Sequence, residues 1–242
     1  MNKCIFLAGA SGAIGRHLAP LLVANGWRVV GTTRSVDKVP VLRHLGVEPV
    51  VVDVFDASAL RSVMAESRPE VVIHQLTDLP FALAGDEMAA ALVRNARLRD
   101  VGTRNLVAAA VHSGARRLIA QSIAFVYGEG PLPHREEDDL LPFTHPTYGE
   151  TTRAVASLEQ QVLAAPLDGI VLRYGLFYGP GTGFDAPIAP GSVHVEAAAK
   201  AAELAVTRGT TGIYNVAEAD GAVVSEKAAR VFGWTADWRV RR

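Results

Sequence analysis

The sequence contains one cysteine, almost no excess of charge and no long apolar run. The single thiol, Cys4, cannot form a disulfide within the chain, and its place in an apolar run predicts a buried strand residue in a reducing compartment, which we expect to be the cytoplasm. With 24 basic and 25 acidic side chains the formal net charge is −1, so no strong field favours nucleic acid or an anionic membrane as a partner. No segment approaches the ~18 consecutive apolar residues of a membrane-spanning helix.

Metal-site and hydrolase patterns are missing as well. The seven histidines show no paired spacing with Cys, Asp or Glu of the kind that zinc or iron requires, so we predict no metal. No Gly-x-Ser-x-Gly elbow follows a strand, which argues against a serine hydrolase. The first 13 residues could pass for a short signal peptide, but their apolar run is brief, carries Lys3 and leads directly into a glycine loop. We therefore interpret them as the start of the domain.

What the sequence does contain is an alternation of short apolar runs with helical stretches. A length of 242 residues suits one α/β domain. Continuous apolar strands between helices are typical of a parallel sheet covered on both faces, so we predict a single doubly wound, Rossmann-type domain over 1–242. The expected strands are "KCIFLAG", "WRVVGTT", "VEPVVVD", "EVVIHQL", "RRLIAQSIAF", "GIVLRYG" and "GIYNV", and the expected helices are 13–25, 57–67, 86–113, 148–164, 195–207 and 223–232. The Pro-rich segments 128–146 and 179–192 are predicted to be surface loops beside the site.

A glycine loop follows the first expected strand and opens the first helix. Its residues are Gly9, Ala10, Ser11, Gly12, Ala13, Ile14 and Gly15. The first glycine permits a tight turn, the second lets the backbone approach a pyrophosphate, and the third allows the helix to pack closely on the strand. The helix N-terminus then offers free N–H groups and a partial positive charge to phosphates. We predict a dinucleotide site; a purely structural glycine turn is the alternative.

The end of the second strand distinguishes the two nicotinamide cofactors. A carboxylate there would bind the adenosine ribose 2′-hydroxyl, whereas an arginine would accommodate a 2′-phosphate. This chain has Arg34 and Ser35 at that point, so we expect NADP rather than NAD, with a solvated surface arginine as the alternative. Asp53, after the third strand, is placed to accept from the adenine amine, although it is also a candidate helix N-cap. We expect Val54, Leu76, Thr77, Tyr148 and Tyr174 to contact the cofactor too.

Taken together, these motifs resemble the extended short-chain dehydrogenase/reductases, the NAD-dependent epimerase/dehydratase group. The resemblance covers most of the chain. It runs through "GASGAIG", "VVIHQLT", "VGTRNLVAAA", "FVYGEG", "HPTYGETTRA", "LRYGLFYGPG", "HVEAAAKA" and "GIYNVAE". It implies hydride transfer between a nicotinamide and a hydroxyl or carbonyl group, carried out by a Tyr-x-x-x-Lys pair, an upstream Ser or Thr, and an Asn.

The catalytic motif departs from that family pattern at three positions. Tyr148 matches the tyrosine, but Thr152 stands at the lysine position. Ile123 occupies the serine position, and Ser122 lies one residue early, so strand alternation should aim it away from the site unless a bulge intervenes. The catalytic candidates are Tyr148, Ser122 and Thr152. The asparagine position holds Arg99, with Asn95 one turn earlier. Arg153 lies about 100° around the helix from the lysine position and does not replace it.

The expected function follows from these losses. A tyrosine without a neighbouring cation stays protonated at neutral pH, so Tyr148 suits proton donation during reduction better than base catalysis. Relatives have several dozen residues where only Gly181 to Val193 stands here, so 176–242 should form a reduced substrate lobe for a small molecule, lined in part by Tyr174. We predict an NADP-dependent oxidoreductase or epimerase-like enzyme, or alternatively a non-catalytic NADP-binding module. The resemblance also implies a possible homodimer through the helices at 86–113 and 148–164.

Overall fold

Seven parallel strands form one sheet in the computed structural model, which describes residues 3–83 and 86–240. The strand order is β3-β2-β1-β4-β5-β6-β9. Their bounds are β1 (Cys4–Ala8), β2 (Arg28–Thr33), β3 (Glu48–Val51), β4 (Val71–His74), β5 (Arg117–Ile123), β6 (Asp168–Tyr174) and β9 (Gly212–Val216). The order reverses between β1 and β4, which is where doubly wound sheets bind their ligands. The predicted α/β fold is confirmed.

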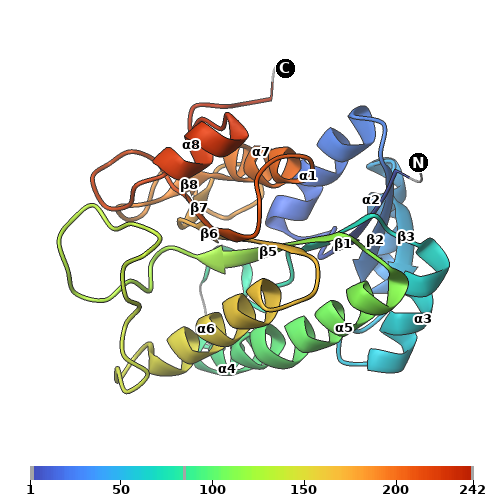
Figure 1. Ribbon diagram of the computed structural model, residues 1–242, viewed down its shortest axis with the longest axis horizontal. Coiled ribbons are helices and arrows are strands. Elements are labelled where there is room, and N and C mark those ends of the chain that lie inside the picture. Colours follow the sequence, from blue (N-terminus) through green and yellow to red (C-terminus); the bar gives the residue numbers. More distant parts are fainter. Residues whose placement is uncertain (1–2, 84–85, 241–242) are drawn as a thin grey trace.

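Helices cover both faces of the sheet (Figure 1). One face carries α1 (Ala13–Ala24), α2 (Val39–His44), α7 (Val195–Ala205) and α8 (Glu226–Phe232), and the other carries α3 (Ala57–Ser67), α4 (Met88–Arg97), α5 (Thr103–Ser113) and α6 (Gly149–Leu163). The predicted helices are all present to within a few residues. Periodicity does not predict α2, which has six residues and begins Val-Pro, or the two-residue strands β7 (Phe177–Tyr178) and β8 (Val193–His194). Within the described residues no helix is long and apolar enough to cross a membrane.

The helix expected over 86–113 contains a π turn. Residues Leu98–Gly102 form this turn between α4 and α5, and within it Leu98, Arg99 and Gly102 are buried. A π turn inserts an extra residue into the helical repeat, so side chains on either side of it face different directions. Such turns occur frequently at functional sites.

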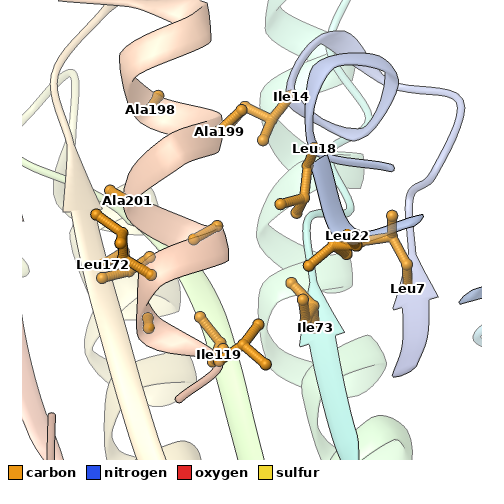
Figure 2. Close-up of a cluster of buried hydrophobic side chains, with 14 of the residues drawn as sticks. Leu7, Ile14, Leu18, Leu22, Ile73, Ile119, Leu172, Ala198, Ala199 and Ala201 are labelled. Carbon is orange, nitrogen blue, oxygen red and sulfur yellow. The ribbon is translucent and has the colours of Figure 1, made fainter. Parts of the chain in front are cut away.

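The core on the α1 and α7 face fixes the positions of the central strands (Figure 2). Leu7, Ile73, Ile119 and Leu172 project from four strands toward Leu18 and Leu22 of α1 and the alanines of α7, and all are buried. Alanines at 198, 199, 201 and 202 carry little side-chain volume, so α7 packs closely against both the sheet and α1. Cys4 is buried in β1 as predicted, and burial raises the pKa of its thiol.

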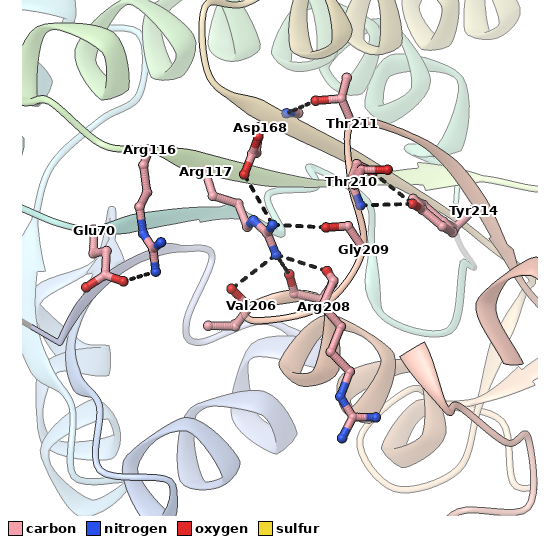
Figure 3. Close-up of polar contacts among 12 residues, drawn as sticks. Glu70, Arg116, Arg117, Asp168, Val206, Arg208, Gly209, Thr210, Thr211 and Tyr214 are labelled. Atoms are coloured by element: carbon pink, nitrogen blue, oxygen red, sulfur yellow. Dashed lines mark hydrogen bonds and ion pairs between the residues drawn. The ribbon is translucent and has the colours of Figure 1, made fainter. Parts of the chain in front are cut away.

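At the amino end of the sheet, Arg117 holds several segments together through hydrogen bonds (Figure 3). Its guanidinium donates to the carbonyls of Ala205 at 2.8 Å, Val206 at 3.3 Å, Arg208 at 2.9 Å and Gly209 at 3.0 Å, and to the Asp168 carboxylate at 3.2 Å. Next to it, Arg116 pairs with Glu70. This network joins the first residues of β5 and β6 to the end of α7 and the segment before β9.

Candidate functional site

A cavity of about 290 Å³ lies at the carboxyl ends of β1, β2 and β4. We call it the switch-point cavity. Most of its polar lining comes from three loops, after β1, β2 and β4. The lining residues are Ala8, Gly9, Ser11, Gly12, Thr32, Thr33, Arg34, Ser35, Lys38, Val52, Val54, Leu60, Gln75, Leu76, Thr77, Leu98 and Leu106. It therefore brings together eight of the predicted cofactor contacts: Gly9, Ser11, Gly12, Arg34, Ser35, Val54, Leu76 and Thr77.

The glycine loop has the geometry that its sequence predicts. Gly9 has a φ of +88°, and a Cβ there would lie 2.6 Å from the carbonyl oxygen of Gln75. A Cβ on Gly15 would collide with the backbone of Gly9 and Ala10, so helix α1 can begin this close only with glycine. No side chain caps the N-terminus of α1 and its first turn has no acidic residue. Its first N–H groups are therefore available to an anion.

Two neighbouring predictions need qualification. The side chain of Ile14 is buried in the core, so only its backbone faces the loop. Asp53 is exposed and does not line the cavity; its carboxylate accepts the N–H of Phe55 at 2.9 Å, while Asp56 is the N-cap of α3. Asp53 is thus neither in the cavity nor the helix cap, because the turn after β3 is longer than the sequence indicated.

The end of β2 presents positive charge to the cavity. Arg34 and Ser35 line it as predicted, and Lys38, from the short helical turn Val36–Lys38, lines it too. Sequence reasoning missed Lys38, although a basic residue four positions after Arg34 was a visible signal. The half-exposed Arg34 side chain lies 3.4 Å from the carboxylate of Asp78, which Arg94 also approaches at 3.7 Å.

The three predicted catalytic side chains do not converge. Tyr148 is the N-cap residue of α6, is 45% exposed and stacks on His145 with ring centroids 5.5 Å apart. Thr152 is fully buried, and its Oγ1 donates to the carbonyl of Tyr148 at 2.9 Å. A threonine bonded back to its own helix cannot supply the missing cation. Arg153 instead lies over the ring of Phe143.

Ser122 belongs to a buried ion pair. Its Oγ donates to the carboxylate of Glu159 at 2.7 Å, so the side chain points toward α6, as the one-residue offset predicts. Arg173 on β6 donates to both oxygens of the same carboxylate, at 2.8 and 2.7 Å, and to the hydroxyl of Tyr127 at 2.9 Å. Glu159 was not expected from the sequence. The predicted catalytic role of Ser122 is therefore corrected to a structural one.

Tyr174 lies in the core rather than in the cavity. It is fully buried, packs edge-on against Phe177 with centroids 5.4 Å apart, and its pKa is raised by burial. Its hydroxyl faces the Gln75 side chain, but neither forms a well-aligned hydrogen bond. Tyr174 ends β6 with its side chain on the α7 face, behind the cavity wall, so the predicted direct contact with a cofactor is not seen.

His74, the last residue of β4, is buried with both ring nitrogens in use. Its Nδ1 accepts the N–H of Leu76 at 3.2 Å and its Nε2 lies 3.1 Å from Thr103 Oγ1, which assigns the proton to Nε2. Burial, with a smaller contribution from Arg99, lowers its pKa to about 4. Asn95, considered as a substitute for the family asparagine, instead accepts the N–H of Asp78 at 2.9 Å and holds the loop after β4.

A second, smaller cavity of about 190 Å³ lies between the two predicted surface loops. Its lining comes from Ala124, Phe125, Tyr127, Leu132, His134, Pro190, Gly191, Ala222 and Val223. The rings of Tyr127 and His134 stack at 4.9 Å, and most other lining groups are apolar. The loops at 128–146 and 179–192 thus both contribute to this cavity.

Comparison with known proteins identifies the family. The model of the NAD dependent epimerase/dehydratase family matches residues 5–212. The chain belongs to this family. It is 44% identical over 182 residues to a 3-diazoavenalumate denitrifying reductase of a Streptomyces species, and 34% identical over 176 residues to a dTDP-4-dehydrorhamnose reductase of Streptomyces griseus. These alignments cover 74% and 72% of the chain, but only 58% and 50% of those relatives.

Solved structures share the fold. A UDP-glucose 4-epimerase of Thermotoga maritima superimposes with a TM-score of 0.78 at 19% identity, covering 97% of this chain and 94% of that one. The Bordetella bronchiseptica enzyme WbmG, solved with NAD, superimposes with a TM-score of 0.76 at 18% identity, covering 99% and 91%. At such identities the likeness establishes the fold and not the substrate.

Proposed function

We propose that this epimerase/dehydratase family member binds NADP in the switch-point cavity and reduces a small substrate at a carbonyl or similarly electrophilic group. The observation that carries the proposal is the cavity itself. It combines an uncapped helix N-terminus for phosphates with Arg34, Ser35 and Lys38 at the end of β2. Two cations there favour a 2′-phosphate over a bare ribose hydroxyl.

Reduction suits the catalytic region better than epimerisation or alcohol oxidation. Oxidation needs a base, and among the described residues no lysine or arginine is hydrogen-bonded or ion-paired to Tyr148. A neutral phenol can still donate a proton as hydride arrives. Tyr148, half-exposed at the start of α6, is our proposed donor. Two of the similar proteins carry reductase names, which supports the same direction.

A small, largely apolar substrate fits the second cavity. Its volume of about 190 Å³ is below that usual for drug-sized ligands, and its lining offers Tyr127 and His134 as the polar groups. The loop that joins β7 to β8 spans only 179–192, which leaves little room for a sugar-nucleotide lobe. We therefore propose a reduced substrate-side lobe over 176–242.

A non-catalytic NADP-binding module is the second candidate. The observation in its favour is that two of the three catalytic candidates use their hydroxyl groups inside the fold: Ser122 donates to Glu159 and Thr152 donates to the carbonyl of Tyr148. Steady-state NADPH oxidation with a panel of small aldehydes and ketones separates the two. Turnover that falls at least tenfold in Tyr148→Phe supports the reductase, whereas tight NADPH binding with no turnover on any substrate supports the module.

Cofactor choice has its own test. Removing the guanidinium in Arg34→Ala should weaken NADPH binding by ~1.5–3 kcal/mol and leave NADH almost unchanged. Isothermal titration of both nucleotides measures this difference. Arg43→Ala, a basic residue in the last turn of α2 that does not line the cavity, is the matched control. An unchanged NADPH preference in Arg34→Ala would remove the guanidinium from the proposed 2′-phosphate site.

A further inference from the structure

Arg99 is a buried guanidinium without a neutralising partner. It lies in the π turn between α4 and α5 and is only 7% exposed. No acceptor among residues 3–83 and 86–240 makes a hydrogen bond or ion pair with it. An arginine has five N–H donors and stays charged at any physiological pH. A buried charge in this state is strongly unfavourable unless something compensates it.

The nearest ionisable groups do not compensate Arg99. It is close enough to Glu159 on α6 and to His74 at the end of β4 for electrostatic interaction with both. However, both carboxylate oxygens of Glu159 are already bonded to Arg173, and Ser122 donates to one of them. His74 is neutral, with its unprotonated nitrogen accepting a backbone N–H. Two guanidinium groups and one carboxylate leave this region with one uncompensated positive charge.

Arg99 does not itself line the switch-point cavity, but residues next to it in the fold do. Leu98, the residue before Arg99, lines that cavity, and so do Gln75, Leu76 and Thr77, which directly follow His74. The elements on both sides of the guanidinium thus contribute to the cavity wall.

We infer that Arg99 binds an oxyanion that a ligand brings to the inner end of the switch-point cavity. The anion is a phosphate of the dinucleotide or a carboxylate of the substrate, and a guanidinium recognises both through the same paired N–H geometry. The inference rests on the proposed function in taking this cavity as the dinucleotide site. It assigns a binding role to a position where the family pattern has an uncharged asparagine, and it explains why a cation is tolerated there.

Three variants test the inference: Arg99→Gln, Arg99→Lys and the control Arg104→Gln. Arg104 carries the same charge one turn later, but its side chain is 62% exposed and pairs with Asp100. Each purified protein is melted alone, with inorganic pyrophosphate, and with benzoate in the presence of saturating NADPH. NADPH and NADH are titrated calorimetrically into each. Removing an uncompensated buried charge should leave the melting temperature of Arg99→Gln without ligand unchanged or raised by a few degrees.

The ligand arms identify the source of the anion. If the dinucleotide supplies it, Arg99→Gln loses stabilisation by pyrophosphate and binds both NADPH and NADH at least tenfold more weakly, with partial recovery in Arg99→Lys. If the substrate supplies it, nucleotide binding is unchanged and the benzoate-induced shift is lost. Arg104→Gln should match the wild-type protein throughout.

Two results would count against the account in different ways. Arg99→Gln that melts several degrees lower without ligand, yet responds to all ligands like wild type, would make Arg99 a structural residue and overturn the inference. The second result is a wild-type protein that binds neither nucleotide but is stabilised by pyrophosphate, with that stabilisation lost in Arg99→Gln. This result would overturn the proposed function and support the anion site.

Discussion

The two ends of the sheet use their arginines differently. At the amino end, Arg117 donates to four backbone carbonyls and to Asp168, and the network is complete within the chain. At the carboxyl end, Arg99 is buried and has no acceptor among the described residues. A fold tolerates a buried charged group without a partner in the chain where a ligand supplies the partner. We therefore interpret the amino end of the sheet as built for stability and the carboxyl end as built to bind a ligand.

The carboxyl end is itself divided. Over β1, β2 and β4 the glycine loop and Arg34 line an open cavity. Over β5 and β6, Ser122 is bonded to the buried Glu159–Arg173 ion pair, and Thr152, at the family's lysine position, is bonded to its own helix. The glycine loop thus keeps its tight backbone geometry, while Ser122 and Thr152 have become part of the packed structure.

The largest predicted effect comes from breaking the Glu159–Arg173 ion pair at the carboxyl end of the sheet. Glu159→Gln leaves Arg173 buried without its counter-ion and should lower the free energy of unfolding by ~3–5 kcal/mol. Urea unfolding at pH 7 measures the change. The control Glu150→Gln, exposed on the same helix, should stay within about 0.5 kcal/mol. A loss below about 1 kcal/mol for Glu159→Gln would mean that the ion pair does not hold this region together.

A second substitution tests the amino end. Arg117→Gln removes charged hydrogen bonds to several carbonyls, and because its side chain is only 12% exposed we expect a loss of ~2–3 kcal/mol. The neighbouring Arg116→Gln affects an ion pair whose arginine side chain is 66% exposed, so it should cost about 0–1 kcal/mol. Equal effects of the two substitutions, measured by the same urea titration, would remove the distinction between a closed network and a surface pair.

The pH dependence of stability tests the burial of His74. Burial lowers its folded-state pKa to about 4, whereas an unfolded histidine titrates near ~6.5. The unfolded chain therefore binds a proton first, so stability is highest above pH 6.5 and falls as the pH drops toward 4. We expect this residue to contribute a loss of about 2 kcal/mol between pH 7.5 and pH 5. His74→Gln should flatten that part of the curve, and the exposed His112→Gln should not; identical slopes in both variants would contradict the assignment.

The smallest predicted effect concerns Tyr148. Its ring is 45% exposed and stacks only on His145, so Tyr148→Phe should change the free energy of unfolding by less than about 0.5 kcal/mol. A thermal melt of the variant beside the wild type is sufficient. A loss above about 1 kcal/mol would show that the hydroxyl serves the fold, and the tyrosine would no longer be a residue kept for chemistry.

Local signals predicted the geometry of the glycine loop well. The glycine loop depends on a few adjacent residues whose backbone needs are visible in the sequence, and strand alternation alone gave the direction of Ser122. The Glu159–Arg173 pair was not predictable in the same way, because it joins a helix and a strand whose relative rotation is set by packing. The prediction that Tyr174 contacts a cofactor was wrong for the same reason. A residue at a strand end can face the helices on either side of the sheet, and Tyr174 faces the core under α7.

The π turn shows the same limit. A helix over 86–113 follows from periodicity, but the extra residue that turns Arg99 inward depends on how α4 and α5 meet α6. Lys38 was missed because the short helix after β2 has too few residues for a periodic pattern. Tertiary packing, rather than propensity, decides these details.

A calorimetric titration of NADPH and then NADH into the wild-type protein, repeated on Gly9→Ala, tests the central claim most directly. The account predicts saturable binding of one NADPH per chain, weaker NADH binding, and loss of both in Gly9→Ala, where the added Cβ would lie 2.6 Å from the carbonyl oxygen of Gln75. Absence of binding by either nucleotide to the wild-type protein at millimolar concentration would contradict it. The switch-point cavity would then be a feature of the inherited fold without its ligand.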